Sequence, residues 1–389
     1  MQPPETELIT GMNKKNNQYN DQYYSYQKGG KKQSRNQEFT DVYSNHNGRK
    51  PKNPRGRSNV VPAKKQRRGI GTIIAVFLIF IFVAVVLFAL QLMTKVNTNE
   101  IPKSDDALGI MPGASYGSKV TNIALFGLDD RTNTFKGRSD VIMVLSVDKK
   151  HDKIKMTSIL RDSLVHIDGY GEDKLNHAYS YGGAELAIKT LNQNFNLDIK
   201  NYVTVNFNNM AGIVDAVGGI DLTITEGEMN EINRNLDMLV AEEAEIEVKD
   251  TDYIYENGDV HLNGMQAVAF ARIRILDSDS ERAVRQQKVM GGVMDSVKST
   301  SVFGYPGLLN AILPMCETSM DMPAVLGVAP IMLTNFTMDS LSIPGSAENA
   351  ADGYTDAGNW VYVYDRDYAA KHIDAFVKED DSEYWYEFY

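Results

Sequence analysis

The chain has 389 residues, a formal net charge of −11, six histidines and one cysteine. The single cysteine excludes an intrachain disulfide, and the histidines are not spaced as zinc ligands. Residues 1–68 hold fifteen Lys and Arg against five Asp and Glu, a net charge of +10, which leaves −21 for the remainder. Such asymmetry is typical of segments that lie in different compartments.

The first segment, residues 1–68, is rich in Asn, Gln, Lys, Tyr and Gly and poor in aliphatic side chains. It has too little apolar surface to offset the entropy of ordering, so we expect a disordered tail. Its positive charge suits either nucleic acid or the anionic inner leaflet of a membrane. We favour the leaflet and expect no nucleic-acid partner.

Residues 69–94 contain no charged side chain and include the run IGTIIAVFLIFIFVAVVLFALQLM. About 20 apolar residues span a bilayer, whereas a cleaved signal peptide has a shorter apolar region near residue 1. We therefore predict a single N-terminal transmembrane helix in the cell membrane. The basic cluster Lys64, Lys65, Arg67 and Arg68 precedes it, which predicts a cytoplasmic N-terminus and an extracellular body.

Residues 95–118 contain Pro, Gly, Ser and Asp and are predicted to form an extracellular linker. Beyond them, apolar runs predict strands at 122–128, 141–148, 154–160, 202–207 and 220–225. Helices are predicted at 184–195, between a cap at Asn208 and the Gly218-Gly219 pair, in a short stretch after Leu262, and at 280–297. Residues 226–260 are acidic and expected to be irregular. The interleaved strands and helices predict an α/β fold.

Two carboxylates lie at the ends of neighbouring predicted strands. Asp129 follows the first strand in GLDDR, and Asp140 begins the second in GRSD. If the strands are neighbours, both side chains meet at one loop end and suit Mg²⁺ with phosphate oxygens as further ligands. The alternative is a pair of solvated turn aspartates.

Several arginines lie near these strand ends or on the last predicted helix: Arg131, Arg138, Arg161, Arg272, Arg274, Arg282 and Arg285. Guanidinium groups bind phosphate oxygens in a bidentate geometry, so a shared anionic ligand accounts for them together. Structural ion pairs with Asp and Glu are the alternative. On a helical wheel Arg282 and Gln286 border the apolar stripe of their helix, while Glu281 lies opposite.

Seven segments together resemble the LytR-CpsA-Psr family, in the family's order from about residue 120 to 295: NIALFGLDDR, GRSDVIMVLSVD, SILRDS, GYGEDKLNHAYSYGG, YVTVNFNNMAGIVDAVGGIDL, LNGMQAVAFARIR and ERAVRQQKV. The resemblance implies a mixed central β-sheet flanked by helices, with an apolar cavity for a lipid. It implies a catalytic domain over residues 119–378, including a late strand at VYVYD, and a C-terminal tail at 379–389.

The resemblance also implies a function. Members of the family move a teichoic acid, capsule or related polymer from a polyprenyl diphosphate carrier to peptidoglycan, as phosphotransferases assisted by Mg²⁺ (or Mn²⁺). By motif, Asp129 and Asp140 correspond to the metal ligands. The implied catalytic residues are Asp129, Arg131, Arg138, Asp140, Arg161 and Asp162. The implied substrate-binding residues are Lys174, Asn176, Arg272, Arg274, Arg282, Arg285 and Gln286.

The sequence departs from the family pattern at three places: Leu160 stands where Pro is usual, Asp130 where a small residue is common, and Glu281 where Gly is common. None of these removes a functional side chain. Three other functions stay open. The first is hydrolysis of the lipid diphosphate, the second is non-catalytic glycolipid binding, and the third is transcriptional attenuation. The predicted topology disfavours the third.

Overall fold

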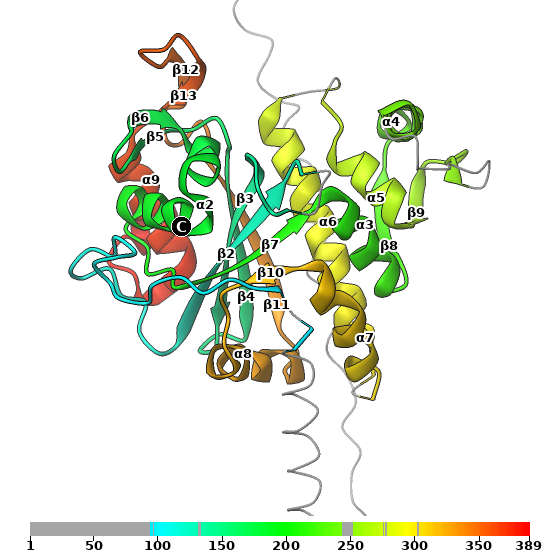
Figure 1. Ribbon diagram of the computed structural model, residues 1–389, viewed down its shortest axis with the longest axis horizontal. Helices are drawn as coiled ribbons and strands as arrows, with labels where there is room; N and C mark the ends of the chain where they lie inside the picture. The colour runs from blue at the N-terminus through cyan, green and yellow to red at the C-terminus, as the bar shows by residue number, and fades with distance from the viewer. Residues whose placement is uncertain are drawn as a thin grey trace, which may run out of the picture. The chain divides into compact units, whose positions relative to one another are not determined.

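The structure is a computed structural model of the whole chain, and it describes residues 94–95, 97–130, 134–242, 252–274, 276, 278–301 and 303–389 (Figure 1). The predicted tail at 1–68 and residues 69–93 of the predicted membrane helix lie outside the described residues, as does Arg131. Within the described ranges, no helix is both long and apolar enough to cross a bilayer.

A seven-stranded sheet forms the centre of the domain, in the order β1-β10-β7-β2-β3-β4-β11. The sheet is mixed, because β2 pairs antiparallel with β3 and parallel with β7. Its central strands are buried on both faces, which is why they are almost continuous apolar runs in the sequence. The strands are β1 (Asn97–Thr98), β2 (Val120–Leu128), β3 (Ser139–Asp148), β4 (Lys153–Ile159), β7 (Asn201–Asn206), β10 (Glu317–Thr318) and β11 (Thr337–Ile343).

Helices cover both faces of this sheet (Figure 1). On one face α2 (Leu175–Phe195) and α9 (Arg366–Lys378) pack against β2 and β3 in one apolar core. On the other face α3 (Phe207–Ala216), α5 (Gly264–Ala271) and α6 (Asp279–Ser299) form a second core. The predicted α/β fold with a mixed central sheet between helices is confirmed.

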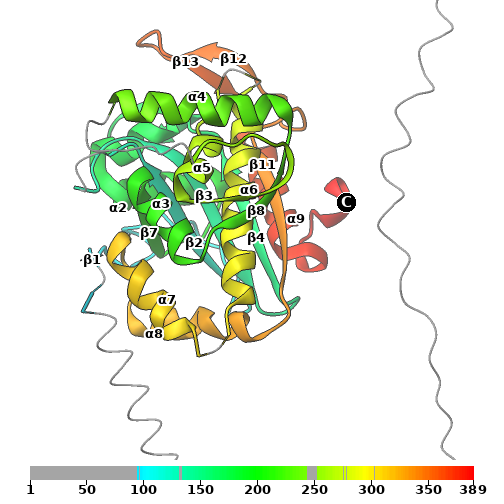
Figure 2. The ribbon, with the colours of Figure 1, turned by 90° about the vertical axis from the view of Figure 1, so that its right-hand side faces the viewer.

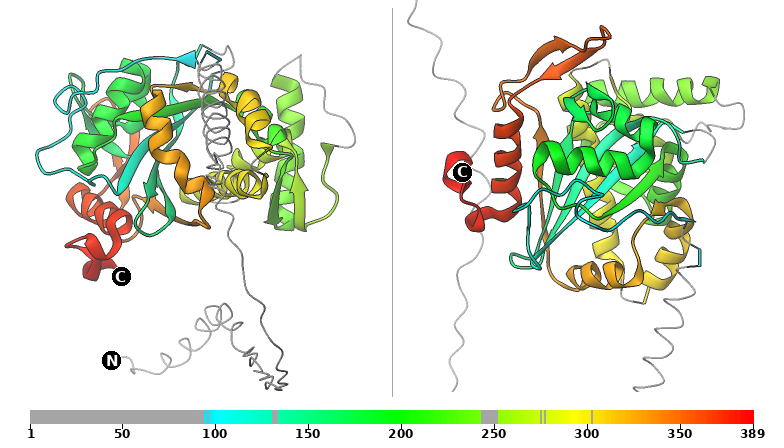
Figure 3. Two further views of the ribbon diagram at one scale, coloured as in Figure 1. Left: turned by 90° about the horizontal axis from the view of Figure 1, so that it is seen from below. Right: turned by 60° about the vertical axis from the view of Figure 1, so that its left-hand side comes forward.

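Three two-stranded sheets lie outside the central sheet in the described part of the chain. They are β5 (Leu164–Ile167) with β6 (Gly171–Lys174), β8 (Ile220–Ile224) with β9 (Gly258–Leu262), and β12 (Ala351–Tyr354) with β13 (Trp360–Val363). Figure 3 shows that the β12–β13 hairpin, in orange-red, stands out from the rest of the domain.

The remaining helices are α4 (Glu226–Glu242), α7 (Tyr305–Ile312), α8 (Met322–Val328) and α10 (Trp385–Phe388), with short 3₁₀ turns at Leu313–Met315, Ala329–Leu333 and Glu379–Asp381. Figure 2 shows α4 crossing above α5, while α7 and α8 lie together at the other end of the domain.

Two local predictions were wrong. Residues 226–242 form helix α4 rather than an irregular segment. The side chain of Asn206, not that of Asn208, caps α3 by accepting a hydrogen bond from the Asn209 amide at 2.8 Å. The predicted helix at 184–195 is confirmed as the second part of α2, because the backbone is non-helical at Gly182 and Gly183, and a helical stretch that was not predicted precedes this break from Leu175.

The predicted linker and C-terminal tail both belong to the folded domain. Leu108 and Tyr116 are buried in the first core, at 0% and 6% exposure, and β1 extends the sheet beside β10. At the other end Glu379 forms an ion pair with Lys155 at 2.9 Å, and Ser382 is buried. Polar composition suggested loops here because both segments bury only a few, widely spaced apolar residues.

Candidate functional site

A β-bulge places Asp140 at the edge of the site. Gly127 pairs with Val141, whereas Leu128 pairs with Ser139, so Asp140 is the extra residue on β3. A bulge turns its extra side chain away from the regular alternation of the strand. Glycine is required at 127, because a Cβ atom there would lie 2.8 Å from the Cβ atom of Val141.

Three guanidinium groups surround the carboxylate of Asp140. Its Oδ2 atom lies 3.0 Å from Arg161 Nη1, 3.5 Å from Arg274 Nη2 and 3.7 Å from Arg282 Nη2. They come from the end of β4, from the loop after α5 and from the first turn of α6. Asp162 and Asp279 also pair with Arg161, and Asp162 with Lys174. The group therefore holds four cations against three carboxylates and keeps a net positive charge for an anion.

Arg282 is the most buried member of this cluster, at 4% exposure. Burial, and then the like charges of Arg161 and Arg274, lower the pKa of Arg282 to about 10. No described residue accepts a hydrogen bond from its Nε atom. A buried guanidinium with an open donor is costly without a ligand, since buried polar groups are nearly always paired.

Asp162 holds two cations in place beside the cluster. Its carboxylate accepts from Arg161 Nε at 3.0 Å and from Lys174 Nζ at 2.6 Å. Burial opposes its ionisation, but the hydrogen bond from Lys174 and the charge of Arg161 outweigh burial and lower the pKa of Asp162. Asp162 is therefore an ionised anchor for its neighbours.

A small pocket opens onto these groups and is lined by both charged and apolar side chains. Its volume of about 20 Å³ leaves room for little more than a water molecule. The lining residues are Asp140, Ile142, Ser158, Ile159, Leu160, Arg161, Asp162, Asp279, Arg282, Ala283, Gln286 and Tyr362. Sequence reasoning missed Asp279 and Tyr362. Asp279 lies 3.9 Å from Arg161. It precedes Arg282 by three residues on the same helix, and this spacing could have indicated from the sequence that the two side chains share a face.

Asp129 and Arg272 belong to a second, neighbouring pocket, together with Asp130 and Phe207. The Arg272 guanidinium lies over the Phe207 ring, 5.3 Å from its centroid. Asp129 is exposed, whereas Asp130 is buried and accepts from the Phe135 amide at 2.7 Å. Asp130, the departure from the family pattern, therefore stabilises its own loop.

The structure separates Arg285 from the other predicted ligand-binding arginines. Arg285 is 2% exposed, donates to the carbonyl of Ile273 at 3.3 Å and lies 3.8 Å from Glu228 of α4. These contacts fix the loop that carries Arg272 and Arg274. Arg285 thus packs behind the cluster, and a direct contact with substrate stays a prediction.

The other predicted residues are placed as follows. Asn176 is buried, its backbone amide donates to the Arg161 carbonyl at 3.0 Å, and its Oδ1 atom has no partner within the described part of the chain. Gln286 lines the pocket beside Arg282. Arg138 is exposed just before β3.

Asp129 and Asp140 are the candidate ligands for a divalent cation of the Mg²⁺ type, with Arg161 already bound to Asp140 at 3.0 Å. Asp129 follows Leu128, Asp140 follows Ser139, and these two preceding residues pair directly across β2 and β3. Paired strands lie about 4.8 Å apart, so the two carboxylates belong to one strand end. Oxygen donors with further ligands from phosphate are the set that Mg²⁺ prefers. The metal site remains a prediction.

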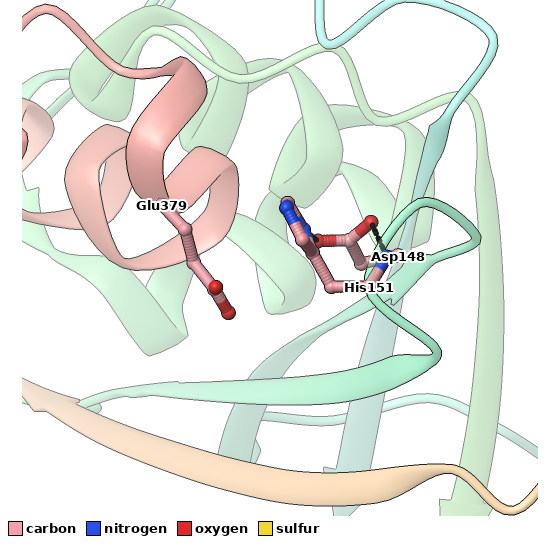
Figure 4. A group of neighbouring side chains, drawn as sticks. All are labelled: Asp148, His151 and Glu379. Atoms are coloured by element: carbon pink, nitrogen blue, oxygen red, sulfur yellow. Dashed lines mark hydrogen bonds and ion pairs between the residues drawn. The ribbon is translucent and has the colours of Figure 1, made fainter.

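A second group of potential metal ligands, Asp148, His151 and Glu379, lies at the opposite end of β3 (Figure 4). The ammonium of the fully buried Lys155 already occupies it, 3.0 Å from Asp148, 2.9 Å from Glu379 and 2.7 Å from the Val377 carbonyl. A divalent cation would meet this fixed positive charge. The group is therefore a structural ion-pair network.

Comparisons with known proteins agree with the fold and the motifs. The profile of the LytR_cpsA_psr family matches residues 91–377. A relative from Bacillus anthracis (strain CDC 684 / NRRL 3495), named polyisoprenyl-teichoic acid–peptidoglycan teichoic acid transferase TagU, is 33% identical over 245 residues, which cover 61% of this chain and 73% of the relative.

Two solved structures share the fold. One is described as TagT bound to LI-WTA, with a TM-score of 0.55 and 22% identity over 73% of this chain and 99% of that chain. The other is the LytR-CPS2A-psr family protein YwtF (TagT) with bound octaprenyl pyrophosphate lipid, with a TM-score of 0.50 and 21% identity over 68% of this chain and 93% of that chain. Because the family profile covers most of the folded domain, the chain belongs to the LytR_cpsA_psr family.

Proposed function

We propose that this protein is a phosphotransferase that moves a cell-wall glycopolymer from a polyprenyl diphosphate carrier to peptidoglycan. The observation that carries the proposal is the group of three guanidiniums around Asp140, with the buried Arg282 lacking a partner for its Nε atom in the described structure. The relative named as a teichoic acid transferase and the family member with a bound octaprenyl pyrophosphate support the assignment.

In the proposed reaction, a hydroxyl oxygen of the acceptor sugar attacks the phosphorus that carries the polymer. The bond from this phosphorus to the bridging oxygen breaks, polyprenyl monophosphate leaves, and a phosphodiester joins polymer and acceptor. Arg161, Arg274 and Arg282 stabilise the negative charge that grows on the phosphate oxygens. A bound Mg²⁺ would neutralise further phosphate charge, held by Asp129 and Asp140.

The acceptor hydroxyl must also lose a proton. Asp162 is poorly suited to take it, because two cations already bind its carboxylate and lower its pKa. A general base needs a pKa nearer the working pH. We therefore assign Asp162 to positioning Arg161 and Lys174, and Asp129 remains the candidate to orient the hydroxyl.

A transfer assay separates this reaction from hydrolysis by the same residues. The full-length protein is incubated with a polyprenyl-diphosphate-linked glycan and Mg²⁺, with or without a peptidoglycan acceptor. We expect polyprenyl monophosphate and a glycan–peptidoglycan phosphodiester only when the acceptor is present. Equal release of lipid phosphate without acceptor would indicate a pyrophosphatase instead.

Arg274 offers the sharpest test of the phosphate contact, since 59% of its side chain is exposed and little packing depends on it. Arg274→Lys keeps the charge but loses the bidentate donor pattern. We expect weaker binding of a prenyl diphosphate to this variant, with an unchanged melting temperature. Wild-type affinity would remove Arg274 from the binding site.

We also propose the membrane topology, with residues 1–68 inside and the folded domain outside. The uncharged run at 69–94 and the basic cluster before it support this. Strand β1 begins at Asn97, so at most a few residues separate the predicted span from the sheet. Protease added to intact protoplasts should degrade the domain, and full protection would contradict the topology.

A further inference from the structure

The β12–β13 hairpin carries a row of aromatic side chains on one face. Tyr354 pairs with Trp360 and Asp352 with Tyr362 across the hairpin, so these four side chains share a face. Val361 projects from the opposite face and is fully buried against the domain. On the aromatic face, Tyr354 at the tip is 71% exposed, whereas Trp360 and Tyr362 are half-buried.

This face continues from the candidate active-site pocket. Tyr362 lines that pocket with Arg161 and Arg282. The Trp360 ring follows, with its centroid 4.7 Å from that of Tyr362 in an edge-to-face arrangement, and Tyr354 lies beyond it. The row thus runs from the charged pocket to the exposed ring of Tyr354 at the tip of the hairpin.

Two contacts fix the hairpin to the groups of the active site. The Tyr362 amide donates to the carbonyl of Asp162 at 2.9 Å. Lys174, which binds the Asp162 carboxylate, has its ammonium 5.8 Å from the centre of the Trp360 ring. The aromatic row therefore has a defined position relative to the phosphate-binding arginines.

We propose that this face binds the pyranose rings of a glycan by stacking. The C–H groups on one side of a pyranose ring carry partial positive charge and pack against the negative face of an aromatic ring. Asp352, exposed on the same face, supplies a carboxylate that accepts hydrogen bonds from sugar hydroxyls. This inference rests on the proposed transfer reaction, which requires sugars on both sides of the reacting phosphate.

The sugar could belong to the polymer on the lipid carrier or to the acceptor strand, since both present pyranose rings. The two sources are separated by the ligand supplied. One arm uses a soluble tetrasaccharide of alternating N-acetylglucosamine and N-acetylmuramic acid. The other compares octaprenyl diphosphate that carries a disaccharide with octaprenyl diphosphate alone.

The chain has two tryptophans, Trp360 and Trp385, so Trp385→Phe makes Trp360 the only one. In this background, the full-length protein in detergent should show a saturable change in Trp360 fluorescence with the tetrasaccharide or with the sugar-bearing lipid. Tyr354→Ala should weaken this binding by about tenfold, which corresponds to 1.4 kcal/mol. Tyr386→Ala, a control with 93% exposure on α10, should leave it unchanged.

In the transfer assay, Tyr354→Ala should raise the KM for the sugar-bearing substrate with little change in kcat. No fluorescence response to either sugar-bearing ligand, or a response to zwitterionic vesicles alone, would overturn the proposal. Sugar binding does not require the transfer reaction. A fluorescence response in a protein that shows no transfer would therefore refute the proposed function but not the sugar-binding site. Transfer that is unaffected by Tyr354→Ala and Trp360→Ala together would refute the site and not the function.

Discussion

Replacing Arg282 with methionine tests whether its helix face is built for a ligand. Arg282 is 4% exposed, and burial with the charges of Arg161 and Arg274 lowers its pKa from the usual 12.5 to about 10. At about 1.4 kcal/mol per pKa unit, the environment destabilises the charged form by roughly 3 kcal/mol. Methionine keeps much of the side-chain volume and removes the charge. The contact with Asp140 at 3.7 Å is lost, which offsets part of the gain.

We therefore expect Arg282→Met to stabilise the ligand-free protein by about 1 to 3 kcal/mol. For a domain of this size, each kcal/mol raises the melting temperature by about 2 °C. The same variant should lose most of the stabilisation that octaprenyl diphosphate gives the wild type, because a ligand stabilises only through its affinity for the folded state.

Arg285→Met is the matched control, three residues further along α6 and equally buried. Its guanidinium is bonded to the Ile273 carbonyl and lies near Glu228. Removing one partner of a buried pair costs about 3 to 5 kcal/mol, so Arg285→Met should lower the melting temperature.

Thermal unfolding of the full-length variants, with and without octaprenyl diphosphate, measures both effects. A large fall in the melting temperature of ligand-free Arg282→Met, together with an intact ligand-induced shift, would refute the reasoning. It would show that Arg282 is structural despite its open Nε atom.

Four further outcomes are expected. Asp129→Ala should abolish Mg²⁺-dependent transfer without changing the melting temperature, since the side chain is exposed; residual Mg²⁺-dependent turnover would remove it from the site. Asp140→Asn should abolish transfer and also lower the melting temperature, because three guanidiniums lose their shared counter-ion. Lys155→Met should cost about 3 to 5 kcal/mol, measured by urea unfolding, while EDTA should have no effect on this network. Burial opposes the ionisation of Asp148 and Glu379, but hydrogen bonds from His151 to Asp148 and from Lys153 to Glu379, joined by Lys155, lower both pKa values. Their contribution to stability is therefore complete above about pH 4.5 and is lost as the pH falls below about 4; an unfolding free energy that is flat from pH 6 to pH 3 would contradict this.

The sequence predicted the central strands well, because a strand buried on both faces is a short apolar run between charged turns. The predicted strands at 122–128, 141–148 and 154–160 differ from β2, β3 and β4 by at most two residues at either end. The sequence did not predict helix α4, because its many acidic residues made the segment look irregular and its apolar residues are few. Ile232, Leu236 and Leu239 are buried at helical spacing, which was the available signal.

The position of the β12–β13 hairpin could not be predicted. Its strand β13 touches the site through the pairing of Tyr362 with Ser163, two residues that are far apart in the sequence. The local sequence pattern contains no information about such a contact, because tertiary packing decides which strand pairs with which and in what register. The place of Tyr362 in the pocket lining is therefore known only from the structure.

The distinction between Arg282 and Arg285 shows most directly what sequence pattern lacks. Both are arginines on one helix, both are buried, and a helical wheel assigns both to the same side. Their surroundings differ: Arg285 donates to a carbonyl and has one carboxylate nearby, whereas Arg282 shares the Asp140 carboxylate with two other cations. Arg282 has no hydrogen-bond partner for its Nε atom among the described residues, and it lies among like charges beside the bulge that presents Asp140. Such departures cost stability and persist where a ligand compensates for them, so we expect the binding site at this cluster.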